Sequence, residues 1–383
     1  MPQYNGQLNA NEIFGSIFNM IISQQVFADN IYETKSTLAD MSRVDGTLYG
    51  DTKLYYSTDV LKSFEWMNDA EAQNLLKLHR PEDPECQAIT INKFRMIPLT
   101  VDYYLTKRAW STESAFSQFN SQMLSWIRDT KRVFDATMFN SFVGTHQAGL
   151  EDDGAGAKQN HTITLPAEPE GVDDYNTEAY NRLVAQAIAT EMADLIVNLE
   201  DVTRDYNDYG NLRSVSADSL VYVWNSEWVN KIKKLDLPTI FHKDGLIDKF
   251  AQHTLPARYF GNVNASSGTT SGTNITIRSL IEKDYNTVEP HQPGYDAKKH
   301  VFPGDLLPIN TAYGENETYT EDGSIVFKVY HKNSVPFMTA FETGTEFFNP
   351  RSLTETHYLI WGYNELEHLK NYPFVTAKAV NAG

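Results

Sequence analysis

The sequence predicts a mixed α+β fold in which long helices and short strands occupy separate stretches of the chain. Two stretches, 111–144 and about 177–205, carry apolar residues at helical spacing and contain no Gly or Pro before their ends. Elsewhere, short runs of branched and aromatic residues alternate with turn-forming segments, as is typical of strands. The chain has 383 residues, 41% hydrophobic and 12% aromatic, which is more than one compact core usually serves. We therefore expect two or three structural units.

Residues 1–50 are predicted to form an N-terminal arm that carries one short amphipathic helix. The apolar residues that would share one face of this helix are Ile13, Phe14, Ile17, Phe18, Ile21 and Ile22. A polar stretch with few large apolar residues follows from position 29 to 51. An amphipathic helix on an extended arm has few partners of its own. It therefore docks either on the body of the same chain or on a neighbouring subunit, and the sequence leaves both alternatives open.

Residues 51–110 are predicted to form a long two-stranded hairpin. The strand-like runs are 54–56 and 88–101, and the segment 80–85 between them, with two prolines, is typical of a turn. Pro98 argues against a central strand position because proline donates no backbone hydrogen bond. An isolated hairpin is only marginally stable in water, so we expect this one to rest on something outside the segment.

The longest helix is predicted to begin after Ser111 and Thr112, whose hydroxyls can cap its first turn, and to end at Gly144. About 30 residues at 1.5 Å each give a rod of roughly 45 Å, which suggests a structural spine. A linker, 145–174, contains a short strand at 162–165 and precedes the second helix. Further strands are expected at 219–224, followed by a capped short helix, and at 275–277, 325–330 and 356–363.

Charge and composition exclude several functions. The chain carries 32 Lys and Arg against 50 Asp and Glu, a net charge of −18, so sequence-specific binding to nucleic acid and binding to acidic membranes are both disfavoured. Cys86 is the only cysteine, which excludes a disulfide framework within the chain and any multi-cysteine metal site. No stretch combines the basic flank and apolar core of a secretory signal or approaches the length of a membrane span.

No motif indicates catalysis. The sequence has no phosphate-binding glycine loop, no Gly-x-Ser-x-Gly motif and no histidine pair at metal-ligand spacing on a helix. Asp205-x-Asn207-x-Tyr209-Gly210 begins like a calcium loop, but its twelfth position is Ser216 instead of a bidentate Glu. Paired carboxylates such as Glu321-Asp322 lie in segments marked by Gly or Pro. We accordingly predict no catalytic residue, no cofactor and no metal.

The order of segments resembles the major capsid proteins of tailed bacteriophages, which have the Hong Kong 97-like fold. Three stretches carry the likeness: the run from Ile89-Thr90-Ile91 to Leu99-Thr100-Val101, the helix ending RDTKRVFDATMFNSFVG at 128–144, and the strand and capped helix LVYVWNSEWVNKIKKL at 220–235. The resemblance implies five segments: an N-terminal arm at 1–50, an extended loop at 51–110, a peripheral domain with the spine helix at 111–175, an axial domain at 176–324, and return strands of the peripheral domain at 325–383.

The resemblance also implies partners. Such subunits assemble as hexamers and pentamers into an icosahedral shell around double-stranded DNA, with the arm and the extended loop lying across neighbours. The residues expected at subunit contacts are Ile13, Phe14, Ile17, Phe18, Ile21, Tyr55, Tyr56, Phe64 and Trp66. Portal, scaffold and decoration proteins would be further partners, DNA would be enclosed without sequence-specific binding, and no membrane would be involved. The protein would be assembled in the host bacterial cytoplasm and reside in the virion.

Two alternatives remain open at this level. The 21 Tyr and 6 Trp, beside many loop carboxylates, are compatible with a carbohydrate-active hydrolase or a sugar-binding module. A compartment of the encapsulin type would share the capsid fold but enclose protein cargo. Particle formation separates the first alternative from a shell protein, and DNA content separates the second from a virus.

Overall fold

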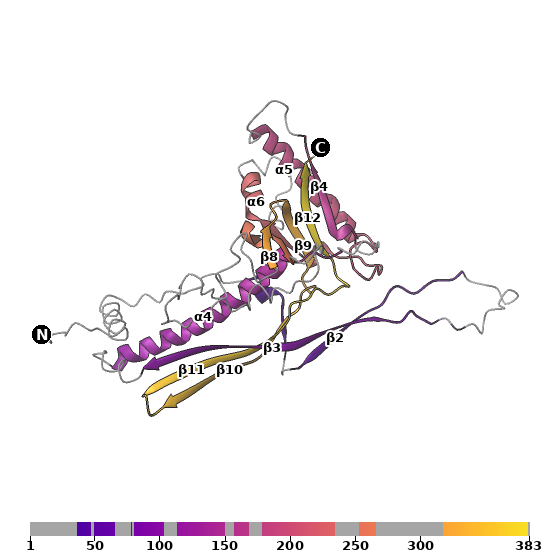
Figure 1. Cartoon of the computed structure of the whole chain (residues 1–383). Helices are drawn as coiled ribbons and strands as arrows, with labels where there is room; N and C mark the ends of the chain where they lie inside the picture. Colours follow the sequence, from indigo (N-terminus) through magenta and orange to yellow (C-terminus); the bar gives the residue numbers. More distant parts are fainter. Residues whose placement is uncertain are drawn as a thin grey trace. The chain divides into compact units, whose positions relative to one another are not determined.

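The structure is a computed structural model that describes residues 37–46, 50–65, 78, 80–102, 113–149, 157–167, 178–233, 253–265 and 317–381 (Figure 1). The chain divides into two compact units. The first comprises Met1–Asp51, Thr90–Thr137 and Phe337–Glu365, and the second comprises Thr52–Ile89, Met138–Pro336 and Leu366–Gly383. Each unit is therefore built from segments that lie far apart in the sequence.

The first unit is a β-sheet with one face covered by a helix. Its described elements are α2 (Leu38–Met41), β1 (Arg43–Asp45), most of β3 (Glu85–Asp102), the first part of α4 (Glu113–Thr145), β10 (Phe337–Asn349) and β11 (Thr354–Asn364). β11 is antiparallel to both β10 and β3, and β1 adds in parallel to β10. The order in the whole sheet, with β2 of the second unit at its edge, is β1-β10-β11-β3-β2.

Aromatic packing holds α4 against this sheet. The Phe134 ring makes edge contacts with Trp361 and Tyr363 of β11, at centroid distances of 5.8 and 5.7 Å. The guanidinium of Arg95 on β3 lies 4.5 Å from the centre of the same Phe134 ring. Since side chains alternate between the two faces of a strand, the apolar side chains of Phe94 and Met96 face the other way and are about half exposed.

The end of the predicted arm is part of the first unit. Thr37 caps α2 by accepting a hydrogen bond from the Asp40 amide, and Asp40 accepts one from the Thr37 amide in return. β1 then pairs with β10. Residues 37–45 thus dock on their own chain, whereas Ile13, Phe14, Ile17, Phe18 and Ile21 lie outside the described residues.

The second unit is a five-stranded mixed sheet, in the order β4-β12-β9-β5-β6, packed against α5, with a separate β7–β8 pair. Its elements, besides the start of β3 and the end of α4, are β2 (Thr52–Ser57), η1 (Ala157–Gln159), β4 (Asn160–Leu165), α5 (Glu178–Glu200), η2 (Ala217–Ser219), β5 (Leu220–Asn225), α6 (Ser226–Lys233), β6 (His253–Leu255), η3 (Ala257–Tyr259), β7 (Gly261–Ala265), β8 (Glu317–Glu321), β9 (Ile325–His331) and β12 (Phe374–Asn381).

The core of this unit lies between α5 and the sheet. Ile188, Met192 and Leu195 recur at helical spacing on α5 and are buried with side chains of β4, β5, β9 and β12. β5 is buried along its whole length, as the apolar run at 219–224 predicted. α5 itself ends at Glu200, five residues before the expected end, because the chain turns there and Thr203 pairs with Arg213.

The structure differs from the sequence expectation for the C-terminal strands. Residues 325–383 do not form one set of return strands: β9 and β12 belong to the sheet of the second unit, and β10 and β11 to that of the first. The physical reason is strand pairing between distant segments, since β12 pairs with β4 and β9 while β11 pairs with β3. The expected strand at 275–277 lies outside the described residues.

Gly144 does not end the spine helix, which continues to Thr145. A Cβ atom at Gly144 would overlap the carbonyl oxygen of Tyr259 and lie 2.6 Å from its carbonyl carbon. The glycine is therefore required by the close approach of the η3 backbone, and not by a helix terminus. Pro98 does occupy an edge, because β2 reaches only the start of β3 and the described partner of β3 at Pro98 is β11 alone.

Candidate functional site: the rooted hairpin

The predicted hairpin at 51–110 is described on both sides of its root, by β2 and by the start of β3. Along β2 the side chains alternate in exposure: Leu54 and Tyr56 are 52% and 64% exposed, whereas Tyr55 is half-buried and Ser57 is buried. Burial raises the pKa of Tyr55, and the neighbouring Tyr372 raises it further. One face of the strand is thus turned to the rest of its own unit and the other to solvent.

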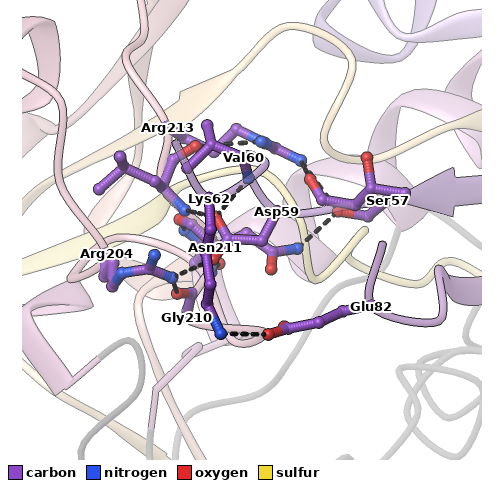
Figure 2. Close-up of polar contacts among 12 residues, drawn as sticks. Ser57, Asp59, Val60, Lys62, Glu82, Arg204, Gly210, Asn211 and Arg213 are labelled. Atoms are coloured by element: carbon purple, nitrogen blue, oxygen red, sulfur yellow. Dashed lines mark hydrogen bonds and ion pairs between the residues drawn. The ribbon is translucent and has the colours of Figure 1, made fainter. Parts of the chain in front are cut away.

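Arg213 is the centre of a polar cluster at the root (Figure 2). Its Nη2 donates to the Ser57 hydroxyl at 3.2 Å and to the Thr58 carbonyl at 2.6 Å. Its Nε donates to the side-chain oxygen of Asn371 at 3.1 Å, and that oxygen also accepts a hydrogen bond from Ser57 at 2.6 Å. The side-chain amide of Asn211 donates to Ser57 at 2.8 Å. The rigid fork of a guanidinium is suited to hold several acceptors at once.

Asp59 forms a second anchor two residues beyond Ser57 (Figure 2). Its carboxylate accepts hydrogen bonds from the amides of Leu212, at 3.0 Å, and Val60, at 2.8 Å, and forms an ion pair with Arg204 at 2.6 Å. The hydrogen bond from Leu212, together with those from Arg204 and Val60, lowers the pKa of Asp59 to about 2. The carboxylate is therefore ionised throughout the neutral range and fixes the chain as it leaves β2.

The segment 203–213 that supplies these partners is a turn held by asparagine. Asn207 accepts a hydrogen bond from the Asn211 amide at 2.9 Å and donates to the Asn211 carbonyl at 2.7 Å, and Gly210 between them has a positive φ of 66°. The Arg204 guanidinium also bonds the Gly210 carbonyl at 2.7 Å. Asp205 is engaged in an ion pair with Lys158. In the segment whose sequence resembles the start of a calcium loop, Asn207 thus stabilises the turn and Asp205 pairs with Lys158.

The second strand of the hairpin is anchored through Gln87. Its amide nitrogen donates to the His368 carbonyl at 2.9 Å, and its oxygen accepts from the Lys370 amide at 3.1 Å. Lys370 in turn accepts, through its carbonyl, from the amide of Asp208 at 2.9 Å. Both strands are consequently pinned to the segments 203–213 and 366–372 of the same unit, which supports the expectation that the hairpin rests on residues outside itself.

Beyond the root, the described part of the hairpin exposes large apolar side chains. Leu61 is 76% exposed, Phe64 65% and Leu78 77%, and Val60 is exposed as well. The ion pair there, Lys62 with Glu82 at 3.5 Å, is itself exposed and contributes little to stability. Of the predicted contact residues, Tyr56 and Phe64 are therefore exposed, Tyr55 is half-buried, and Trp66 lies outside the described residues. The exposure of these apolar side chains makes them candidates for contact with another protein.

An ion network centred on the buried side chains of Lys131 and Asp135 joins β1, α4 and β10 in the first unit. Asp135 on α4 pairs through Oδ2 with Lys131, at 3.3 Å, and with Arg43, at 3.4 Å, and Lys131 also reaches Glu342 at 3.2 Å. Burial raises the pKa of Asp135, although Lys131 and Arg43 oppose that shift. The spacing of Lys131 and Asp135, four residues apart on a predicted helix, is compatible with their pairing, but nothing local indicates Arg43 or Glu342, which lie far away in the sequence.

Of the paired carboxylates noted in the sequence, Asp322 has a structural role. In Glu321-Asp322, Asp322 accepts from the Ser324 amide at 3.1 Å and the Ser324 hydroxyl at 2.5 Å, and pairs with Lys378 at 3.2 Å, so it stabilises a turn. Among the described residues, one group has the spacing of metal ligands: Glu346, Glu355 and His357. The described helices include none with an apolar stretch long enough to cross a bilayer.

Comparison with solved structures identifies the fold. The chain matches one in the capsid structure of Staphylococcus phage Andhra with a TM-score of 0.59 and 11% identity, over 99% of this chain and 88% of that one. It matches a chain in the structure of head fiber and inner core protein gp22 of native bacteriophage P68 with a TM-score of 0.57 and 11% identity, over 92% and 88%. No protein-family model and no curated protein sequence matches the chain.

These matches show that the chain has a mixed α+β fold found in phage capsid structures, and that the fold extends over nearly its whole length. The likeness to phage capsid proteins that the segment order predicted is thereby confirmed at the level of the fold.

Proposed function

We propose that this chain is the shell-forming major capsid protein of a tailed bacteriophage, located in the virion. The observation that carries the proposal is the fold match over 99% of the chain to a phage capsid structure. A structural role also suits the described side chains at the hairpin root, whose ionised groups are engaged in holding the hairpin and its supporting turn. The protein has no enzymatic activity in this proposal.

The elements correspond to parts of the Hong Kong 97-like fold. α4 is the spine helix, and the sheet of β10, β11 and β3 is the peripheral domain. The second sheet with α5 is the axial domain, and the hairpin between β2 and β3 is the extended loop. The support for these assignments is the length of α4, 33 residues, and the pairing of β3 with the distant β11.

Subunits assemble as hexamers and pentamers through the hairpin and the N-terminal arm. The hairpin has an ordered root and exposed apolar side chains beyond it, including Leu61 and Phe64. Anchored in this way, it presents those side chains at a defined place and loses little conformational entropy when a neighbouring subunit covers them. Portal, scaffold and decoration proteins are further partners in this proposal.

The shell encloses double-stranded DNA without binding it tightly. The net charge of −18 supports this part of the proposal, because an acidic wall gains no counterion-release energy from binding phosphates. A tight, salt-sensitive complex between isolated capsomers and duplex DNA would contradict it.

The test is assembly of the expressed protein, followed by negative-stain microscopy and by measurement of nucleic-acid content. We expect closed particles from the wild type and far fewer from Leu61→Ser/Phe64→Ser, with unchanged circular dichroism. The matched control is Leu183→Ser/Val197→Ser, which changes two exposed apolar side chains of α5 and should leave particle yield unaltered. A wild type that stays monomeric under assembly conditions would refute the shell function. Equal particle yields from the two variants would refute the role of the hairpin in assembly but not the shell function.

A further inference from the structure

Three side chains with metal-binding groups lie on one face of the β10–β11 hairpin. Glu346 on β10 is the direct partner of His357 on β11, and Glu355 precedes His357 by two residues and therefore points to the same face. One ligand atom from each of the three side chains lies within 4.8 Å of the others. The register of two antiparallel strands thus brings together residues that the sequence separates by a turn.

The surroundings of these side chains are partly apolar. On the third strand, β3, Leu99 lies opposite His357 and Val101 lies opposite Glu355. The side chains of His357 and Glu355 are only 18% and 23% exposed, whereas Glu346 is exposed. Neighbours of this kind limit water access and strengthen the binding of an ion.

The charges of the two carboxylates are not balanced within the described structure. Glu355 Oε1 lies 3.9 Å from His357 Nε2. No described Lys or Arg side chain lies within 4.0 Å of either carboxylate. Two converging carboxylates beside an imidazole are stabilised by a cation placed between them.

The geometry points to a binding site for a divalent transition-metal ion of the zinc class at Glu346, Glu355 and His357. Zinc accepts imidazole nitrogen and carboxylate oxygen at about 2.0–2.2 Å, so two of its ligand atoms lie about 3.4 Å apart. The three ligand atoms lie within 4.8 Å of one another, so small side-chain rotations would bring them to that separation. Calcium and magnesium prefer ligand sets made entirely of oxygen, which the imidazole does not provide. A water molecule completes the coordination.

Binding at this site joins β10 to β11 near their connecting turn. The ion stabilises the folded first unit, because the unfolded chain does not hold the three groups together.

The test uses the full-length protein, freed of metal with a chelator and titrated with zinc chloride by calorimetry at pH 7.5. We expect the wild type to bind one more equivalent of zinc per chain than the His357→Asn variant does. Mutating residues that only hydrogen-bond to a metal ligand typically lowers metal affinity about 10- to 100-fold. Loss of a ligand itself, in Glu346→Gln, should therefore lower the zinc affinity of this site at least tenfold. Zinc should raise the unfolding temperature of the wild type and not that of His357→Asn.

A matched control is His161→Asn. In the second unit, His161 Nε2 lies 3.1 Å from Glu191 Oε2. Among the described residues, no further histidine, cysteine or carboxylate joins this pair to make a cluster of three possible ligands. This variant should bind zinc like the wild type. Cobalt should give the intense visible absorption of a four-coordinate ion in the wild type and the His161 variant only. Equal zinc stoichiometry and affinity in all four proteins would overturn the inference.

Discussion

Replacing Gly144 by alanine tests the packing of the spine helix against η3. In most helices this change is favourable by about 1 kcal/mol, because glycine is the weaker helix former. At Gly144 the added methyl would meet the backbone of Tyr259, lying 2.6 Å from the carbonyl carbon and 3.1 Å from its Cβ. Carbon atoms in contact are normally about 3.5–4.0 Å apart, so helix or loop must move by about 1 Å.

The expected net effect is a loss of stability. Overpacking of a filled site costs about 1–3 kcal/mol, and the upper part of that range applies because the obstructing atoms are backbone. After the gain in helix propensity, the free energy of unfolding should fall by about 1–2 kcal/mol. For a unit of this size, that lowers the unfolding temperature by about 2–8 °C.

The assay is thermal and urea unfolding of the unassembled protein, followed by circular dichroism. Gly344→Ala is the control, because a Cβ there meets nothing within 4 Å. We expect Gly344→Ala to change the unfolding temperature by no more than the experimental error or to raise it slightly. If Gly144→Ala were as stable as the wild type or more stable, the close approach of Tyr259 would not be the reason for glycine at this position.

Three further predictions concern charged and titratable groups. Arg213→Lys should speed the hydrogen exchange of the backbone amides at 57–60 about tenfold or more, because one ammonium group cannot replace the guanidinium hydrogen bonds to Ser57, Thr58 and Asn371. The control, Lys62→Gln, breaks only an exposed ion pair and should leave this exchange unchanged. Equal exchange rates in the two variants would contradict the anchoring role of Arg213. Asp135→Asn should lower the free energy of unfolding, measured with urea, by about 1–3 kcal/mol, because Lys131 and Arg43 lose their buried partner and keep only the more exposed Glu342 and Asp40; Lys131→Met/Asp135→Leu should recover part of that loss, and an Asp135→Asn protein as stable as the wild type would refute this reasoning. Burial, with His368 and Lys328 nearby, holds the pKa of His146 well below its ordinary value, so the stability that neutral His146 contributes is complete above pH about 6.5 and is lost below it by up to about 1.4 kcal/mol per pH unit. His146→Phe should therefore gain stability relative to the wild type between pH 7.5 and 5.5, and a difference independent of pH would count against the linkage.

The helices and the buried strand could be predicted because their signals are local. The apolar positions of α4 and α5 repeat every three or four residues, and 219–224 is a continuous apolar run. Pro98 was placed at an edge for an equally local reason, its missing N–H. Tyr56 and Phe64, expected at subunit contacts, are exposed, and their contact with a neighbouring subunit stays a prediction.

The rest could not be predicted because it depends on which distant segments pair. Nothing in 325–383 shows that β9 and β12 join one sheet while β10 and β11 join another. Nothing near Arg213 reveals that its partners are Ser57 and Asn371, which lie more than 150 positions away on either side.

By itself, the sequence determined the class of the fold, the position of its long helices, its acidic charge and an order of segments that resembles phage capsid proteins. Only the tertiary structure decided the division into two sheets, the reason for Gly144, the anchoring of the hairpin and the convergence of Glu346, Glu355 and His357. The physical reason is that helix periodicity and charge are properties of neighbouring residues. Strand register and close backbone approaches arise from contacts whose free energy depends on the whole folded chain.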